Sequence, residues 1–224
     1  MKRYAHRGIH TEAVENSADA VFAAYESRAD GLEVDIRRLA DGTLVLHHDP
    51  GIQTGKLQDT FRDLSTLTWK EFQSYCDYRP ITLKQAIEHK PPEKILVTEC
   101  KPSRNARAFC RTLIKTLRKL PSENLVCSSE SWKILTILSQ RTTLPLAPVI
   151  TDKRGINRTY LEKNLWREIH LQHELADQKE VLSRCTRYGR PIITWTVNER
   201  RRVEELRELG INGIMTDHED LLIG

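Results

Sequence analysis

The sequence predicts a (β/α)8 barrel of the TIM type, on three observations. Eight short runs rich in β-branched and apolar residues recur along the 224-residue chain, as strands do. Segments with helical spacing of apolar residues lie between these runs, and several of them are closed by glycine. The runs recur about every 20 to 30 residues, which is the alternation that eight β-α units require. An open doubly wound sheet is the alternative fold.

Each predicted strand is a short run of this kind, bounded by turn-forming or charged residues. In chain order the strands are "KRYAHR" (2–7), "GLEVDIR" (31–37), "KILVTECK" (94–101), "NLVCSS" (124–129), "PLAPVIT" (145–151), "REIHLQ" (167–172), "PIITWTV" (191–197) and "INGIMTD" (211–217). The predicted helices are amphipathic, with one apolar face each. They occupy residues 17–28, 106–120, 131–141, 179–189 and 201–210.

One connection is about twice as long as the others, between the second and third strands. We expect one barrel domain over residues 1–224, with an insertion at roughly 41–92. Within it, "DGTLVLHHD" predicts an added strand after an Asp-Gly turn, and "TWKEFQSY" and "TLKQAIEHK" predict short helices. An insertion on a β-to-α loop overhangs the catalytic face of a barrel.

Composition excludes several classes of protein. Lysine and arginine total 35 against 31 aspartates and glutamates, and no basic, aromatic track runs along the chain, so a local anionic ligand is favoured over nucleic acid. Five cysteines without CxxC spacing argue against a disulfide framework or a structural zinc site. The first residues lack an apolar signal region and no run of ~18 apolar residues occurs, so we expect a soluble, cytoplasmic protein.

Two predicted strands carry charged pairs where a core is expected. Glu33 and Asp35 lie two residues apart, so both point to the same side of their strand, which is the interior of a barrel. Glu99 and Lys101 repeat this spacing. A divalent cation would compensate such buried carboxylates, and oxygen ligands favour magnesium, calcium or manganese over zinc. The alternative is a structural ion network with arginines such as Arg37.

Two histidines accompany these carboxylates. His6 ends the first predicted strand and His48 ends the inserted strand, so both can lie at the rim that presents the carboxylates. A single histidine in a strand is more often a packing residue, but two beside a metal suit proton transfer near neutral pH. His47 alternates with His48 and is expected to face the other way.

Seven motifs occur in a fixed order over nearly the whole chain: "HRG", "EN" at Glu15 and Asn16, "LEVDIR", "DG" followed by "LVLHHD", "TECK", "ITWTVN" and "GINGIMTD". In order and spacing this set resembles the glycerophosphodiester phosphodiesterase family. The resemblance implies a (β/α)8 barrel that hydrolyses a small-molecule glycerophosphodiester to glycerol 3-phosphate and an alcohol. It also implies one divalent cation, Mg2+ or Ca2+, with Mn2+ as a further candidate. Whether the chain forms a homodimer stays open.

The resemblance also implies roles for single residues. It makes Glu33, Asp35 and Glu99 the metal ligands, His6 and His48 the acid-base pair, and Arg7 and Lys101 phosphate contacts. We take His6 as the base and His48 as the acid. The direction of proton transfer and the nucleophile, either water or the substrate's own glycerol hydroxyl, stay open.

Four further residues receive weaker predictions. Trp195 either packs on the glycerol backbone of a substrate or belongs to the barrel core. Asn16 is expected to be the N-cap of the first helix, with a ligand contact as the alternative, and Asp217 is expected to cap a helix or order a loop. Cys100 alternates away from Glu99 and is expected to pack outward under the helices.

The chain departs from the family pattern at places that bear on specificity. Val14 and Ser17 stand where members often have proline and threonine, and "HDPGIQTG" replaces a run with arginine and threonines, which leaves the choice of alcohol open. A lysophospholipase-D-like enzyme acting on lysophospholipids is one rival. A non-catalytic barrel that binds metal and phosphorylated ligands is a second, disfavoured because both histidines and all three carboxylates are present. A nucleic-acid phosphodiesterase is a third, disfavoured because no basic, aromatic track stands out.

Overall fold

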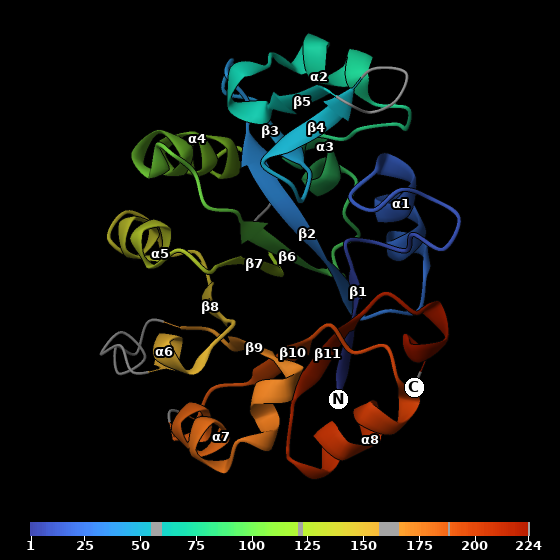
Figure 1. Cartoon of the computed structure of the whole chain (residues 1–224), viewed down its shortest axis with the longest axis vertical. Coiled ribbons are helices and arrows are strands. Elements are labelled where there is room, and N and C mark those ends of the chain that lie inside the picture. The colour runs from blue at the N-terminus through green and yellow to red at the C-terminus, as the bar shows by residue number, and fades with distance from the viewer. Residues whose placement is uncertain (55–59, 121–122, 157–165, 188, 224) are drawn as a thin grey trace.

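Eight parallel strands close into a barrel in the part of the chain that the computed structural model describes, residues 1–54, 60–120, 123–156, 166–187 and 189–223 (Figure 1). Neighbouring strands pair in the order β1, β11, β10, β9, β8, β7, β6 and β2, and pairing of β2 with β1 closes the ring. The strands are β1 (Lys2–His6), β2 (Gly31–Arg38), β6 (Ile95–Cys100), β7 (Leu125–Ser129), β8 (Leu146–Ile150), β9 (Ile169–Gln172), β10 (Ile192–Trp195) and β11 (Gly213–Thr216). The TIM-barrel prediction is therefore confirmed.

Helices surround the barrel on its outside (Figure 1). Those at the five predicted places are α1 (Ala18–Glu26), α4 (Ala106–Leu117), α5 (Trp132–Ser139), α7 (Lys179–Thr186) and α8 (Arg200–Glu208). The sequence pattern does not predict the short α6 (Lys153–Ile156) or the 3-10 turns η1 (Leu64–Thr66), η2 (His173–Asp177) and η3 (Glu219–Leu221).

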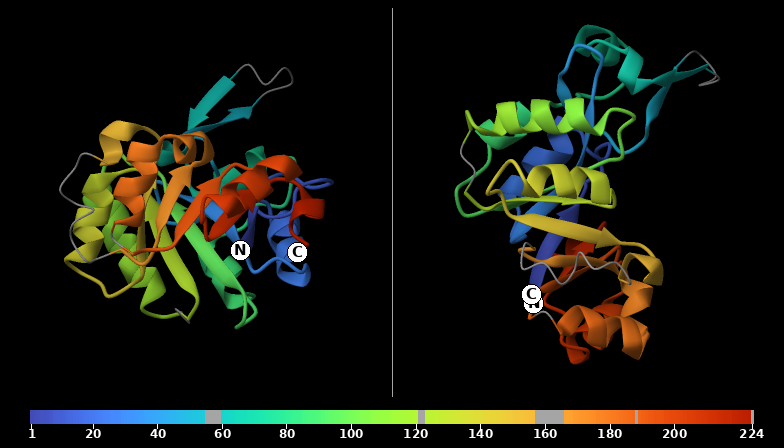
Figure 2. Two further views of the ribbon diagram at one scale, coloured as in Figure 1. Left: turned by 90° about the horizontal axis from the view of Figure 1, so that it is seen from below. Right: turned by 90° about the vertical axis from the view of Figure 1, so that its left-hand side faces the viewer.

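The segment between β2 and β6 contains the predicted added strand and two helices. β3 (Leu44–Leu46) pairs antiparallel with β2, and α2 (Trp69–Tyr75) and α3 (Leu83–Glu88) each begin at a capping box. A hairpin of β4 (Gly51–Thr54) and β5 (Thr60–Asp63) was not expected; it projects away from the barrel in Figure 2. A small apolar core holds the segment together: Leu39, Val45, Ile52, Leu64, Leu67 and Phe72.

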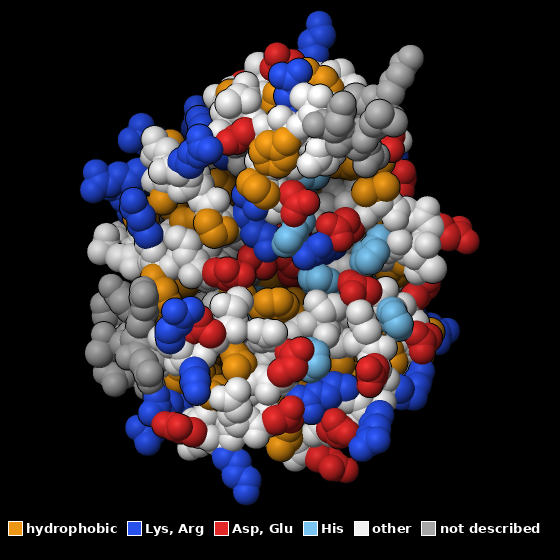
Figure 3. Space-filling model, viewed as in Figure 1, with side chains coloured by type: hydrophobic (Ala, Val, Ile, Leu, Met, Phe, Trp, Pro, Cys, Tyr) orange, Lys and Arg blue, Asp and Glu red, His pale blue; other side chains and the backbone are white. Residues whose placement is uncertain are grey.

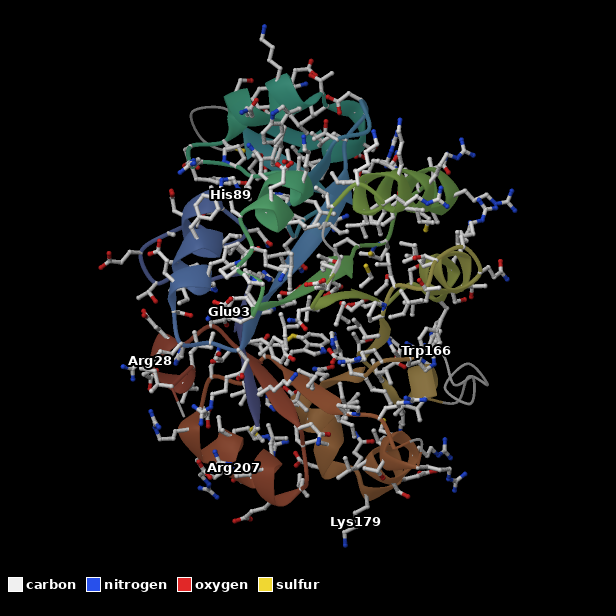
Figure 4. The ribbon with its side chains drawn as sticks, turned by 180° about the vertical axis from the view of Figure 1, so that it is seen from behind. Arg28, His89, Glu93, Trp166, Lys179 and Arg207 are labelled. Carbon is white, nitrogen blue, oxygen red and sulfur yellow. The ribbon has the colours of Figure 1, made fainter. Side chains whose placement is uncertain are left out.

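Alternation along the strands builds two apolar layers and leaves polar positions inside the barrel. On β2, Leu32, Val34 and Ile36 join the outer layer between strands and helices, whose side chains fill that space in Figure 4. Cys100 is fully buried in this layer, as expected. The inner layer is small and comprises Tyr4, Val97, Val126, Ala147, Ile193 and Met215. Because each buried Leu or Ile contributes roughly 1.5–3 kcal/mol, the outer layer stabilises the barrel and frees its interior for charged groups.

None of the helices in the described part of the chain combines the length and the apolar character needed to span a bilayer.

Candidate active site

The carboxyl ends of β1, β2 and β6 bring His6 and the three predicted metal ligands together. Strand register places His6 beside Glu33 and Asp35 beside Glu99. One oxygen from each of Glu33, Asp35 and Glu99 lies within 4.8 Å of the others. Glu33 and Asp35 are buried, and Glu99 is partly buried. Acidic, basic and histidine side chains gather in the hollow at the middle of this face in Figure 3.

The three carboxylates are not compensated equally. The Lys101 ammonium lies 2.9 Å from both Asp35 and Glu99, and the Arg7 guanidinium lies 3.3 Å from Asp35. Burial alone would raise the pKa of Asp35, but Lys101 and Arg7 outweigh it and hold that pKa below its usual value.

Glu33 has the opposite environment. Burial, together with the charges of Asp35 and Glu99, raises its pKa well above the usual range. Among the described residues no lysine or arginine lies within ion-pair distance of Glu33, and its Oε1 is buried without a hydrogen-bond partner. A carboxylate oxygen in this state fits a cation ligand.

The residues present therefore fit a divalent cation. Three carboxylates face two cations, Arg7 and Lys101, and Arg7 also pairs with a fourth carboxylate, Glu15, at 2.8 Å. The alternative, an ion network in which Arg37 pairs with these carboxylates, is not formed. The Arg37 guanidinium instead donates to the backbone carbonyl of His48 at 2.8 Å. All-oxygen ligands are those that magnesium, calcium and manganese prefer.

The turn after β1 explains the "HRG" motif. Arg7 and Gly8 both have left-handed backbone, with φ of 59° and 84°. A side chain at position 8 would place its Cβ 2.6 Å from the carbonyl oxygen of Ala20, so glycine is required there. The turn directs the Arg7 side chain back over Asp35. There the Arg7 guanidinium donates hydrogen bonds to both carboxylate oxygens of Glu15. The predicted phosphate contact thus lies beside the carboxylate cluster.

The prediction that Asn16 caps the first helix is wrong. Ser17 is the N-cap of α1, since its hydroxyl accepts from the Ala20 amide at 3.1 Å. Asn16 is buried with left-handed backbone, and its side chain donates to Asp35 at 2.9 Å and accepts from the Asp35 amide at 3.0 Å. Asn16 therefore orients a predicted metal ligand.

Asp217 does more than order a loop. Its Oδ1 accepts from His6 Nδ1 at 2.7 Å and lies 3.3 Å from His10 Nε2, and its Oδ2 accepts from the Asn198 amide at 2.8 Å. The donors lower the pKa of Asp217 against the effect of burial, and the bond to Asp217 raises the pKa of His10. The contact between Asp217 and His6 could have been predicted from closure of the barrel, because closure places the ends of β11 and β1 side by side.

His48 lies in the loop after β3. The amide of the preceding residue, His47, donates to the backbone carbonyl of Asp35 at 2.9 Å, which ties this loop to β2. His48 Nδ1 bonds to Asp49 at 2.8 Å. His47 instead contacts Tyr78 and the Gly51 carbonyl, so the two adjacent histidines face different surroundings, as expected.

Trp195 ends β10 at the mouth of the barrel. It is half-buried against the inner apolar layer, and its Nε1 is buried without a hydrogen-bond partner. Its position is compatible with both readings of the sequence, a core residue and a surface for a substrate.

The comparison with known proteins agrees with this geometry. A model of the glycerophosphoryl diester phosphodiesterase family matches residues 6–221. The chain belongs to this family. Membership makes it an enzyme of the phosphodiesterase class and decides against the non-catalytic binding barrel.

Individual relatives of the family are similar over nearly their whole length. A glycerophosphodiester phosphodiesterase of Caldanaerobacter subterraneus is 26% identical over 236 residues, which cover 98% of this chain and 95% of the relative. The crystal structure of a glycerophosphodiester phosphodiesterase from Thermotoga maritima has a TM-score of 0.84 at 24% identity, covering 99% of this chain and 96% of that one. A phosphodiesterase of Oleispira antarctica, solved with its product sn-glycerol-3-phosphate, has a TM-score of 0.81 at 18% identity, covering 99% and 95%.

Proposed function

We propose that this enzyme hydrolyses glycerophosphodiesters to glycerol 3-phosphate and an alcohol, with one divalent cation bound by Glu33, Asp35 and Glu99. The observation that carries the proposal is the group of three converging carboxylates, one with an unpartnered buried oxygen, beside an oriented histidine. When bound, the cation supplies positive charge to the oxygens of the phosphodiester.

His6 is the general base in this proposal. The ionised Asp217 only accepts hydrogen bonds, so the neutral His6 ring carries its proton on Nδ1 and leaves Nε2 as an acceptor. Nε2 lies 4.0 Å from Glu33 and so faces the carboxylate cluster. It takes the proton of the nucleophile, either water or the glycerol hydroxyl of the substrate.

His48 is the general acid. As the bond between phosphorus and the alcohol oxygen breaks, a protonated His48 gives its proton to that oxygen, so that a neutral alcohol leaves. His48 is more exposed than His6, which suits a group that meets different alcohols and recovers its proton from solvent.

Arg7 and Lys101 contact the phosphate. Arg7 offers a planar fork of donors and Lys101 a point charge, and both already lie against Asp35. They stabilise negative charge that develops on the non-bridging oxygens. Trp195 provides a flat surface for the glycerol backbone at the mouth of the barrel.

Hydrolysis of lysophospholipids is the weaker candidate. The cavity beside Lys101 is lined mainly by charged and polar side chains, and so is the one beside Asp217. Among the described residues, the large apolar side chains that line them are Leu64 and Phe109 in the first cavity and Ile223 in the second, which are too few to cover an acyl chain.

The test is release of glycerol 3-phosphate from glycerophosphocholine and glycerophosphoinositol, first in EDTA and then with magnesium, calcium or manganese in turn. We expect release only with added metal, and none from the matched Glu33→Gln variant. Release in EDTA contradicts the metal site. A folded enzyme that is inactive on both substrates with every cation contradicts the proposed function, and release of lysophosphatidic acid from lysophosphatidylcholine instead supports the rival.

A further inference from the structure

A cavity of about 120 Å³ lies next to the candidate active site. The end of β2, the β5–η1 connection and the loop from β6 to α4 enclose it, and its charged lining residues are Arg37, Arg38, Asp63, Lys101 and Arg104. Lys101 belongs to both the cavity and the carboxylate cluster, so the two are contiguous. A water needs only about 10–15 Å³ of such space, so the cavity has room for a phosphate group.

Two of the four cations in the cavity are already neutralised. Lys101 pairs with two carboxylates of the cluster, and Arg104 pairs with Asp63 at 3.1 Å. These pairs leave no net positive charge to attract an anionic ligand.

The other two cations, Arg37 and Arg38, bond to neutral oxygens. Arg37 donates to the His48 carbonyl at 2.8 Å, and Arg38 donates to the Thr112 hydroxyl at 3.1 Å. Within the described residues, neither guanidinium lies within 4.0 Å of a carboxylate oxygen. Each of these two cations would therefore gain from an anionic partner.

The cavity lies on the side of the site that carries His48. Its lining includes Arg37, which holds the His48 backbone, and Pro50, two residues after His48. If His48 protonates the departing alcohol, then a substituent on that alcohol points toward Arg37 and Arg38.

We propose that this cavity binds an anionic group, a phosphate in the strongest case, carried by the alcohol of the substrate. The enzyme then prefers glycerophosphodiesters whose alcohol bears a second negative charge. This inference rests on the proposed function, with His48 as the acid. Phosphate suits arginine because its oxygens accept paired hydrogen bonds from the guanidinium fork.

The cavity does not favour a cationic alcohol such as choline. A quaternary ammonium is bound by exposed aromatic faces, whereas the aromatic residue that lines this cavity, Phe109, is fully buried. Like charge from the two arginines disfavours it further.

The experiment compares glycerophosphoinositol with glycerophosphoinositol 4-phosphate, which differ only in one phosphomonoester. We expect kcat/KM to be about tenfold or more higher for the phosphorylated substrate, since a charged hydrogen bond is worth about 1.5–3 kcal/mol. Added salt should lower this ratio. Arg38→Gln should bring the ratio close to one, and so should Arg104→Gln, because it frees Asp63 to repel the phosphate.

Arg111→Gln is the matched control, because it removes one exposed charge from α4 without touching the cavity. A ratio near one in the parent enzyme overturns the proposal, and so does a preference that Arg38→Gln and Arg104→Gln leave unchanged. If neither substrate is hydrolysed, the proposed function fails, and calorimetric binding of both compounds to the His6→Ala variant with magnesium decides the cavity separately. Tighter binding of the phosphorylated compound supports the cavity, and equal binding overturns it.

Discussion

The two histidines of the proposed acid-base pair are held in different ways. The His6 side chain is 12% exposed at the end of a barrel strand, and its partner Asp217 is fixed in turn by Asn198 and His10. The His48 side chain is 36% exposed in a loop after β3, and its partner Asp49 is 69% exposed. The barrel itself orients one histidine, whereas a solvated neighbour orients the other.

The difference indicates which of the two proposed proton transfers depends more on a fixed histidine side chain. A base that must face one nucleophile gains from being fixed before the substrate binds. Hydrogen bonds at exposed positions compete with water and stabilise little. We therefore expect catalysis to depend strongly on the partners of His6 and weakly on the partner of His48.

The largest effect is expected for Asp217→Asn. An asparagine that turns its amide NH2 to His6 selects the wrong tautomer, and one that turns it to Asn198 places two donors against each other. We expect kcat to fall about 10- to 100-fold with little change in KM, measured by glycerol 3-phosphate release. Asp220→Asn, an exposed change on the same rim, is the control and should retain activity. An equal loss of kcat in both variants would mean that the effect does not come from the contact with His6.

Asn198→Ala should have a smaller effect on the same side. Asn198 donates to Asp217 Oδ2 at 2.8 Å and accepts from the Asp217 amide at 3.0 Å, so its removal loosens the partner of His6 without removing it. Loss of about 1 kcal/mol of hydrogen bonding corresponds to roughly a fivefold lower kcat. Parent-level kcat in this variant would mean that Asp217 is fixed by other contacts.

Asp49→Asn should change kcat by less than about threefold, because an exposed ion pair contributes little. The measurement is the same assay, run beside Asp217→Asn. A loss as large as that of Asp217→Asn would remove the contrast between the two histidines.

The smallest effect is a pH dependence of stability on the His48 side. Burial lowers the pKa of His47, so below about pH 6.5 the unfolded chain binds a proton that the folded chain disfavours. The stability contribution of neutral His47 is thus present at pH 7.5 and falls as the pH decreases. Urea unfolding at several pH values should show a shallower loss for His47→Gln than for the parent, and parallel curves would contradict this.

The sequence predicts the elements that depend on local periodicity. Alternation of Glu33 and Asp35 with apolar residues placed both inside the barrel, and the order of strands brought Glu99 beside them. Local periodicity could not predict hydrogen-bond partners that come from distant parts of the chain. Asp217, for example, lies 211 residues from its partner His6. Asn16 was misplaced because the same amide suits an N-cap and a buried bond to Asp35, and only tertiary structure selects between them.

The most direct test of the account is glycerol 3-phosphate release by His6→Ala and His48→Ala, each compared with the parent enzyme at saturating metal. Thermal unfolding of each variant establishes that the fold is retained. We expect each variant to lose activity by on the order of a hundredfold or more. Release at the parent rate by both folded variants would contradict the proposed acid-base roles.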